Sequence, residues 1–403
     1  MPVPESGPLT LLIAADTYPP DVNGAATVCF RLATELHRRG HHVHVVSARN
    51  EAGPDTVQYR DEATVHRLKS CPAPTHETYR LVSRSHAGQA IGALLDEIKP
   101  DVVHAQCHYM IGEAAILQAE KRRIRTVCTN HFMPENLDPF LPFPQWFRNI
   151  VSKNSWRDMG RLMGKAVAVT TPTPLSAQTM RERAGLDLVL PVSNGINAAK
   201  YQLAEGEEIP KNPYPTVLFV GRLAVEKNID VLLRALSHTG PEIHAEIVGD
   251  GEQRYRLWDL AESLGVDDRV RFLGHLSDEE LRVAYLRADA FCQPGTAELQ
   301  SLVSLEAMSA QKPVILANAL ALPHLVNEGE NGYLFTPGDA GDLADKLQRV
   351  LLAAPAERQK MGERSYQIAL RHSESASVDV LEALYRGATL EEATQLLPEA
   401  TLR

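Results

Sequence analysis

The 403-residue chain lacks the cysteine pattern of a disulfide framework or of a common zinc site. Its cysteines are odd in number and scattered, and none belongs to a Cys-x-x-Cys pair. This usage is typical of a reducing compartment and argues against structural zinc. We therefore expect a cytoplasmic protein. The cysteines are Cys29, Cys71, Cys107, Cys128 and Cys292.

The sequence also lacks long hydrophobic runs. No stretch approaches the roughly 18 to 20 apolar residues that a membrane-spanning helix needs. The first sixteen residues, MPVPESGPLTLLIAAD, hold no basic residue before their short apolar stretch, so a signal peptide is not expected. The expectation is a soluble protein, or one that lies on the inner face of a membrane.

An excess of positive charge is absent as well. The formal net charge is -10, which argues against nucleic acid as the main partner because a basic footprint is missing. The composition, 44% hydrophobic and 23% charged, is that of an ordinary globular protein. The length favours two or three domains over one.

What the chain does contain is a regular alternation of strands and helices. A buried strand at residues 9–15 leads into a loop with paired prolines, a helix over 25–39 and a strand at 43–47. The loop lacks G-x-G-x-x-G, so a nicotinamide dinucleotide site is not indicated. The alternation continues with expected strands at 102–105, 126–129 and 166–170 and a helix over 113–121.

A second alternation starts after the polar connector 205–212. Two consecutive runs of this kind predict two doubly wound α/β domains that face each other across a cleft. The segment from Pro191 to Asn197 has the composition of a hinge between them. The second run predicts strands at 216–220, 244–248, 269–273, 288–292, 314–317 and 332–335, and helices at 228–236, 255–264, 278–286, from about 301, and 338–352.

The stretch Gly295–Met308 places two carboxylates around a helix start. A helix that begins near Ser301 offers free N–H groups and its positive dipole end to an anion. Glu298 precedes that start, and Glu306 follows it amid apolar residues. A carboxylate on so apolar a helix needs a hydrogen-bonding partner. Either a ligand diol or a neighbouring arginine or lysine would serve.

Three strand-end loops in the second half carry polar groups. Arg222 and Lys227 flank one strand-to-helix turn and suit a diphosphate, although a solvated ion pair with Glu226 is the alternative. In the next loop, Gly249 and Gly251 would let backbone approach a ligand. The third loop offers backbone groups at His275 and Leu276 to a base edge.

Histidines mark strand ends in the first half. His131 follows the 126–129 strand, where it is either a ligand contact or a capped structural residue. His104 and His108 leave a strand rather than line a helix, and no acidic third ligand lies nearby. No metal site is expected there.

Residues 140–165 combine aromatic and basic side chains. Trp146 and Trp156 lie among five cations that only Asp158 opposes. A basic, aromatic, amphipathic helix can lie in an anionic membrane interface. The alternative is a surface helix whose apolar stripe packs on the core.

The ordered motifs of the second half, GRLAVEK, VGDGEQ, FLGHLSDEEL, AELQSLVSLEAM and ALPHLVNEGENGYLFTPGD, resemble those of retaining nucleotide-sugar glycosyltransferases of family 4, which have the GT-B fold. TYPPDVNGAA, the His131 loop and SNGIN resemble the first domain of that family. The resemblance covers roughly residues 9–345. It implies an acceptor domain at 1–195 plus 373–403 and a donor domain at 196–372.

The resemblance implies a role for each matching residue. The catalytic group would be His131, Arg222, Lys227 and Glu298. Arg222 and Lys227 would neutralise the leaving diphosphate. Glu306 would accept the ribose hydroxyls and Glu298 would contact the transferred sugar. The donor contacts would be Gly24, Arg222, Lys227, Gly249, Gly251, His275, Leu276, Glu298, Glu306 and the N–H groups of Leu302 and Val303.

Tyr18, Asn23 and His131 would contact the acceptor, which is a lipid or a small molecule. The implied reaction retains anomeric configuration and needs neither metal nor cofactor, with a UDP-sugar favoured and a GDP-sugar as second choice. Departures from the family pattern are Ser301, where relatives usually carry glycine, and Asn197, where they carry aspartate. The alternatives are a GT-B sugar-nucleotide epimerase and a non-catalytic sugar-nucleotide-binding subunit. A phosphorylase would need a lysine-bound pyridoxal phosphate, for which no motif is evident.

Overall fold

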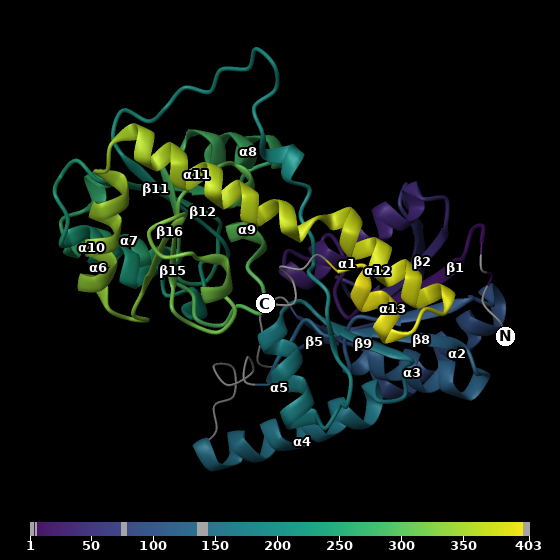
Figure 1. The fold of residues 1–403 in the computed structure, drawn as a ribbon. Helices are drawn as coiled ribbons and strands as arrows, with labels where there is room; N and C mark the ends of the chain where they lie inside the picture. Colours follow the sequence, from purple (N-terminus) through teal and green to yellow (C-terminus); the bar gives the residue numbers. More distant parts are fainter. Residues whose placement is uncertain (1–3, 5, 74–78, 135–143, 398–403) are drawn as a thin grey trace. The chain divides into compact units, whose positions relative to one another are not determined.

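The computed structural model describes residues 4, 6–73, 79–134 and 144–397 (Figure 1). The chain divides into two compact units, Met1–Asn194 with Ser375–Arg403, and Gly195–Glu374. The expected division at 195 and 373 lies within two residues of these boundaries. The first crossing between the units falls inside the 191–197 segment that the sequence marks as a hinge.

The N-terminal unit is built on one eight-stranded sheet in the order β10-β9-β8-β7-β1-β2-β4-β3. Every neighbouring pair is parallel except β3 and β4. The chain order reverses between β1 and β7, which makes that point the topological switch of the sheet. The strands are β1 Thr10–Ala14, β2 His42–Ala48, β3 Thr56–Tyr59, β4 Thr64–Leu68, β7 Val102–Ala105, β8 Arg125–Thr129, β9 Ala168–Thr171 and β10 Leu190–Pro191, and a separate pair joins β5 Cys71–Pro72 to β6 Arg80–Leu81.

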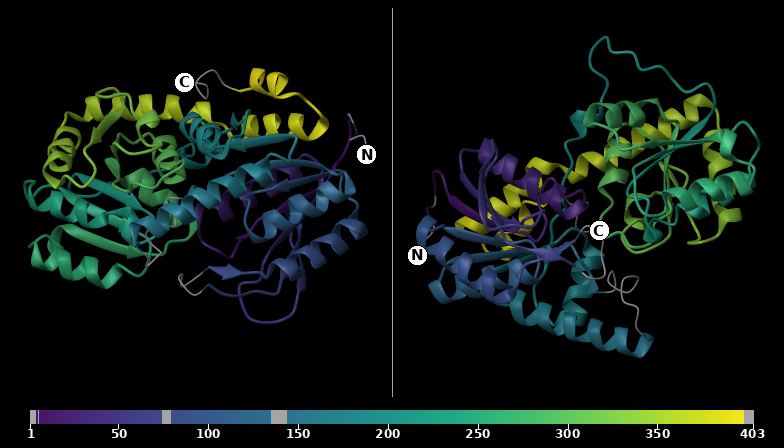
Figure 2. Two further views of the ribbon diagram at one scale, coloured as in Figure 1. Left: turned by 90° about the horizontal axis from the view of Figure 1, so that it is seen from below. Right: turned by 180° about the vertical axis from the view of Figure 1, so that it is seen from behind.

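Helices cover both faces of this sheet because successive strand residues point to opposite faces. Leu11 and Ile13 belong to one core, with α1 and the C-terminal helices α12 and α13. Leu12 and Ala14 belong to another core, with α2 and α3. In Figure 2, α12 and α13 (yellow) lie against the N-terminal unit in both views. The helices are α1 Gly24–Arg38, α2 Arg84–Ile98, α3 Met110–Arg122, α4 Gln145–Met163, α5 Pro174–Ala184, α12 Glu374–Arg386 and α13 Leu390–Gln395.

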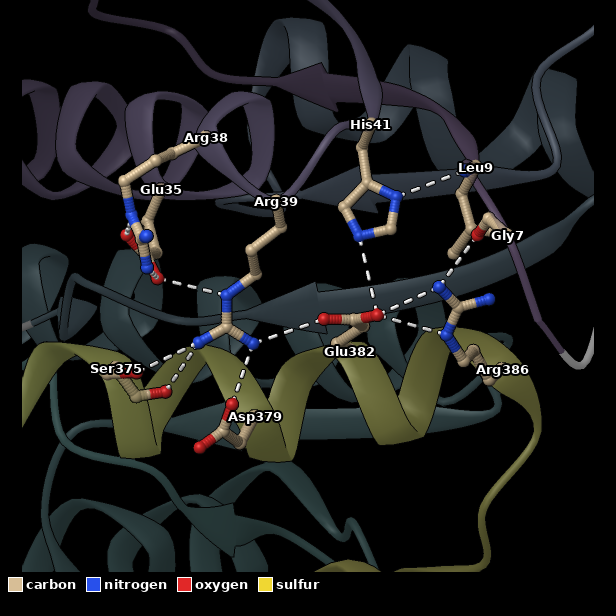
Figure 3. A network of polar contacts seen from close by, with 10 residues as sticks. All are labelled: Gly7, Leu9, Glu35, Arg38, Arg39, His41, Ser375, Asp379, Glu382 and Arg386. Atoms are coloured by element: carbon tan, nitrogen blue, oxygen red, sulfur yellow. Dashed lines mark hydrogen bonds and ion pairs between the residues drawn. The ribbon is translucent and has the colours of Figure 1, made fainter.

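A polar network fastens α12 to the end of α1 (Figure 3). The Arg39 guanidinium donates to Asp379 at 2.6 Å and to Glu382 at 3.1 Å, and it also reaches Ser375. Glu382 accepts a second guanidinium, that of Arg386, at 2.8 Å. The last helices of the chain are therefore part of the N-terminal unit both by apolar packing and by charge.

The C-terminal unit has a six-stranded parallel sheet in the order β13-β12-β11-β14-β15-β16. In chain order this is 3-2-1-4-5-6, the order of dinucleotide-binding sheets, whose switch point lies between the first and fourth strands. The strands are β11 Thr216–Val220, β12 His244–Val248, β13 Val270–Gly274, β14 Ala290–Gln293, β15 Val314–Ala317 and β16 Gly332–Phe335. The helices are α6 Ile229–Ser237, α7 Arg254–Ser263, α8 Asp278–Arg287, α9 Leu302–Ser309, α10 Ala340–Leu351 and α11 Pro355–Ala369.

The predicted fold class, two doubly wound parallel α/β domains, is confirmed. The elements that were not predicted from the sequence include the β3–β4 hairpin, the short strands β5, β6 and β10, and the helices α2, α5 and α11. The hairpin is short and its strand β3 is largely exposed, so it lacks the continuous apolar run that marked the other strands. Among the described residues, no helix has the length and apolar character that crossing a membrane requires.

Candidate functional site

Two loops meet at the switch point of the C-terminal sheet, one after β11 and one after β14. The Asn228 side-chain amide donates to the backbone oxygen of Pro294 at 3.4 Å and to the Thr296 hydroxyl at 3.3 Å. A Cβ atom on Gly295 would lie 3.4 Å from the backbone oxygen of Glu226. The two loops are therefore in direct contact, and open α/β sheets bind ligands at this point.

Four charged side chains come from these loops as two ion pairs. Lys227 donates to Glu298 at 2.5 Å, and their side chains are 23% and 15% exposed. Arg222 donates to Glu226 at 2.6 Å. The pairing of Arg222 with Glu226 is the alternative that the sequence left open. The pairing of Lys227 with Glu298 was not foreseen, and it joins a residue assigned to the diphosphate with one assigned to the sugar.

Helix α9 starts beside these charges. Ser301 is its N-cap, and the Ser301 hydroxyl accepts from the Ser304 backbone N–H at 3.3 Å, so the capping role that its residue type allows is confirmed. The N–H groups of Leu302 and Val303 lie in the first turn, where the helix itself supplies no acceptor. With the helix dipole, they form a partial positive charge at the end of α9.

Glu306 lies inside α9 and is only 6% exposed. The Tyr285 hydroxyl of α8 donates to its Oε2 atom at 3.0 Å. The tyrosine hydroxyl is a partner that the sequence did not reveal, because it lies on the preceding helix. The contact of Glu306 with a ligand diol stays a prediction.

The glycines of the β12 loop have a packing reason that the sequence did not show. Gly249 and Gly251 have φ of 127° and 158°, a region that L side chains rarely adopt. A Cβ atom on Gly249 would lie 1.9 Å from the Gly221 backbone oxygen. The expected close approach is thus made, at least in part, to the neighbouring β11 loop. In the β13 loop, His275 is exposed and Leu276 packs against the core.

At the switch point of the N-terminal sheet, Asp16 follows β1 and is a residue that the sequence analysis did not single out. Its carboxylate accepts from the Cys107 thiol at 2.8 Å and from the backbone N–H of Ile111 at 3.1 Å. Burial raises its pKa above the ordinary value. Asp16 therefore ties the loop after β1 to the start of α3, next to the strand end that carries His131.

His131 lies two residues after β8 and is half-buried. Its Nε2 atom is 2.6 Å from the Oε1 atom of Gln106, which follows β7. Burial lowers the pKa of His131 to about 4, so its ring is neutral at neutral pH. Gln106 is a second residue that the sequence analysis missed, because its side chain type carries no motif.

Two of the expected acceptor contacts have structural roles. Tyr18 is 0% exposed, and its hydroxyl donates to Glu62 at 2.8 Å. Its assignment to the acceptor site is therefore wrong for the side chain: the loop after β1 folds it into the core. Asn23 caps α1 by accepting from the Ala26 backbone N–H at 2.9 Å.

Gly24 meets no neighbour among the described residues that would require a glycine. It is the first residue of α1, it is exposed, and a Cβ atom there would meet nothing within 4 Å. Its φ is not in the left-handed region. The role implied for Gly24, a close approach to a ligand phosphate, stays a prediction.

Helix α4 carries the basic aromatic segment, of which residues 140–143 lie outside the described residues. Its C-terminal half packs inward through Trp156 and Met159. Its N-terminal half exposes Trp146, at 65%, and Ile150. The alternative of a surface helix whose apolar residues pack on the core holds for the C-terminal half, and the membrane-interface role stays a prediction for the N-terminal half.

The two histidines considered as metal ligands make other contacts. His104 lies between the Tyr385 hydroxyl at 2.6 Å and the Thr129 hydroxyl at 2.7 Å. His108 Nε2 is 3.4 Å from the Ser155 hydroxyl. Within the ranges that the structure describes, no three or more acidic, histidine or cysteine side chains gather as metal ligands would.

Comparisons with known proteins match most of the chain. The model of "Glycosyltransferase Family 4" matches residues 22–200, and that of "Glycosyl transferases group 1" matches residues 204–368. The chain is 25% identical over 367 residues to an alpha-monoglucosyldiacylglycerol synthase of Streptococcus pneumoniae, across 88% of this chain and 81% of the relative. It is 28% identical over 399 residues to a D-inositol 3-phosphate glycosyltransferase of Saccharomonospora viridis, across 91% and 90%.

A similar solved structure is the HepE protein of Anabaena in complex with UDP. It superimposes with a TM-score of 0.71 at 20% identity, over 94% of this chain and 98% of that chain. At this identity the likeness concerns the fold, which is the GT-B fold. The two family models match in the expected order, the relatives align over most of their length, and the fold is shared. The chain therefore belongs to glycosyltransferase family 4.

Proposed function

We propose that this glycosyltransferase moves a hexosyl unit from a nucleoside-diphosphate sugar to a hydroxyl of a lipid or small-molecule acceptor, with retention of anomeric configuration. A UDP-sugar is the favoured donor and a GDP-sugar the second choice. The observation that carries the proposal is that the β11 loop, which contains Arg222 and Lys227, contacts the β14 loop that leads into α9 at the switch point of the C-terminal sheet. Similar proteins, which include a UDP complex, an alpha-monoglucosyldiacylglycerol synthase and a D-inositol 3-phosphate glycosyltransferase, support it.

The leaving diphosphate is the group that this charge arrangement suits. Negative charge develops on it as the bond to the sugar breaks, and fixed donors aimed at that charge lower the barrier. Arg222 and Lys227 would supply charge-assisted hydrogen bonds, and the N–H groups of Leu302 and Val303 would bind the distal phosphate. In the structure both cations are held by carboxylates, so the donor would take over part of their pairing.

The carboxylates would recognise the hydroxyls of the donor. Glu306 would accept the ribose hydroxyls, and the Tyr285 hydroxyl orients its carboxylate. Glu298 would contact the transferred sugar while it remains near Lys227. In the β12 and β13 loops, the backbone at Gly249, Gly251, His275 and Leu276 would contact the nucleoside.

The N-terminal unit would supply the acceptor side. Gly24 would let the start of α1 approach the phosphate, and the loop containing Asn23 would border the acceptor. His131 would lie beside the sugar ring. The exposed Trp146 and Ile150 of α4 would hold the protein at an anionic membrane surface, where a lipid acceptor would be available.

The decisive experiment is a thermal-shift and calorimetric screen of UDP-, GDP- and ADP-sugars. We expect one nucleotide class to bind, with the affinity lost in Lys227→Ala and in Glu306→Ala. Lys200→Ala is the matched control, because Lys200 also pairs with an acidic residue of the same unit but is exposed. Unchanged donor binding in both site variants would remove the assignment of the site.

Catalysis is tested separately. Donor hydrolysis by the purified protein, lost in Lys227→Ala, would separate an enzyme from a binding subunit, and release of free nucleotide with transfer of the sugar would exclude an epimerase. We expect the anomeric proton coupling of the product to match that of the donor. We also expect chelation of divalent ions to leave the rate unchanged, since the proposed charge stabilisation comes from side chains.

Membrane contact is tested by flotation with liposomes of neutral and of anionic lipid. We expect binding to the anionic liposomes that is lost in Trp146→Ser. The control is Trp258→Ser, which removes another partly exposed tryptophan from the other unit. Absence of flotation, or equal loss in both variants, would contradict the role of α4.

A further inference from the structure

A buried chain of hydrogen bonds runs from Tyr385 of α12 to Thr170 of β9, and Gln106 lies between this chain and His131. His104 of β7 contacts Tyr385 of α12 on one side and Thr129 of β8 on the other. Thr129 contacts Thr170 of β9 at 2.6 Å, and these two residues are also paired in the sheet register. Gln106 links the ring of His104 to His131. All of these residues belong to the N-terminal unit.

The donor and acceptor of each hydrogen bond can be derived from Thr170 and Tyr385, the two ends of this hydrogen-bond chain. At one end, the Thr170 hydroxyl donates to the Cys128 backbone oxygen at 3.4 Å, so it accepts from Thr129. Thr129, with its only hydrogen used, accepts from His104 Nε2. His104 therefore carries its hydrogen on Nε2 and a lone pair on Nδ1.

The other end gives the same result. The buried Tyr385 hydroxyl has the His104 Nδ1 atom as its partner among the described residues, at 2.6 Å. If it accepted a hydrogen from Nδ1, its own hydrogen would be left buried without an acceptor, which is costly. Tyr385 therefore donates to Nδ1, in agreement with the tautomer derived from Thr170.

The Gln106 amide lies between the two histidines. Its nitrogen lies 3.2 and 3.3 Å from the two ring nitrogens of His104, and its oxygen lies 2.6 Å from His131 Nε2. Since the oxygen faces His131, the hydrogen of the neutral His131 ring resides on Nε2.

We propose that Gln106 is a positioning residue that holds His131 as its Nε2–H tautomer, so that His131 Nδ1 accepts a hydrogen bond from a substrate hydroxyl. Nδ1 makes no hydrogen bond within the part of the chain that the structure describes, and His131 is only half-buried. The substrate part of this inference rests on the proposed glycosyltransfer function; the tautomer does not. In a charged ring both nitrogens carry a hydrogen, so Nδ1 could not accept a hydrogen bond. The proposed role therefore requires the neutral ring.

The tautomer is measured directly by nitrogen-15 NMR of the imidazole rings, with the His131 signals identified by their loss in His131→Asn. In the wild-type protein we expect a protonated Nε2 and an unprotonated Nδ1 at neutral pH. Gln106→Met should yield a mixture of tautomers, because it removes the acceptor. Gln106→Glu should keep the Nε2–H tautomer and raise the pKa of His131, because a carboxylate accepts the same hydrogen bond and favours the charged ring. It serves as the test if the methionine variant does not fold.

Transfer activity gives the second readout. We expect kcat/KM to fall roughly ten- to hundredfold in Gln106→Met, the scale of losing an orienting partner of a functional histidine. The control is Gln118→Met, which replaces a hydrogen-bonded glutamine of α3 that is not part of this hydrogen-bond chain. It should have wild-type activity. An Nδ1–H tautomer in the wild type, or an unchanged tautomer and rate in Gln106→Met, would overturn the proposal. A protein with no transfer activity but the expected tautomer change would contradict the proposed function alone.

Discussion

Replacement of Glu298 by glutamine should change the binding of UDP and of a UDP-hexose in opposite directions. Glu298 has two roles in the proposed complex: it holds Lys227, and it contacts the transferred sugar. UDP lacks the transferred hexose, so only the contact of Glu298 with Lys227 affects its binding. The substitution removes a negative charge while it keeps the shape of the side chain.

The magnitude follows from the geometry of the ion pair. Lys227 Nζ lies 2.5 Å from the Glu298 carboxylate, so a phosphate oxygen on the other side of Nζ would lie roughly 5 to 6 Å from that carboxylate. Two like charges at that separation repel by about 3 kcal/mol at an effective dielectric constant of 20 and by less than about 1 kcal/mol in water. Since both side chains are partly exposed, we expect UDP to bind about four- to tenfold more tightly to Glu298→Gln. The UDP-hexose should bind more weakly, because hydrogen bonds to a charged carboxylate are worth about 1.5 to 3 kcal/mol each.

Calorimetric titration of both ligands at low and high salt measures this difference. The gain for UDP should shrink at high salt, as an electrostatic effect does. Glu330→Gln is the control, because it removes one charge from an exposed ion pair with Arg364 elsewhere in the same unit. Weaker or unchanged UDP binding in Glu298→Gln, or a shift of both ligands in the same direction, would refute the reasoning.

Three further predictions concern stability and are measured by urea unfolding. Arg39→Leu should lower the free energy of unfolding by about 2 to 3 kcal/mol, because the 17% exposed guanidinium has several partners on α12 that would lose their hydrogen bonds. Arg38→Leu, which removes a side chain that is 69% exposed, should change it by less than about 0.5 kcal/mol, and equal effects would contradict the anchoring role of Arg39. Ser301→Ala should cost about 1 kcal/mol and Ser301→Gly only a few tenths, and the reverse order would refute the capping role. Burial lowers the pKa of His104 to about 3 and of His108 to about 4, below the unfolded value of about 6.5. The free energy of unfolding is therefore highest above about pH 6.5, and on acidification it falls by about 1.4 kcal/mol per pH unit for each ring. His108→Asn should reduce that slope, and a free energy of unfolding that stays constant from pH 7 to pH 5 would contradict the prediction.

The alternating strands and helices could be predicted because buried parallel strands are continuous apolar runs with turn residues at their ends. The charged loops at the switch point of the C-terminal unit followed from the same pattern, since each loop comes directly after a predicted strand. Their partners could not be predicted. Whether Lys227 pairs with a ligand or with Glu298 depends on how two loops 71 positions apart meet in space.

The misassigned and missed residues have one physical cause. The resemblance implies an acceptor contact for Tyr18, but the loop after β1 turns its ring into the core, where Glu62 accepts the hydrogen bond of its hydroxyl. Tyr285 and Gln106 were missed because they act on Glu306 and His131 through long-range contacts. A single sequence indicates residue types and local periodicity. It does not indicate which hydroxyl or amide will face a given carboxylate or ring.

The return of the chain to its first unit has a consequence for synthesis in the cell. One face of the N-terminal sheet is covered in part by residues such as Leu381 and Leu384, which leave the ribosome only after the whole Gly195–Glu374 unit. At about 5 to 20 residues per second, that face stays uncovered for roughly 10 to 40 s, longer than most chains need to collapse. During that interval the nascent chain displays an apolar sheet surface next to a second domain that can already fold. A ribosome-associated chaperone would therefore bind the N-terminal unit, which is synthesised first but completes its core only when the last helices have been made.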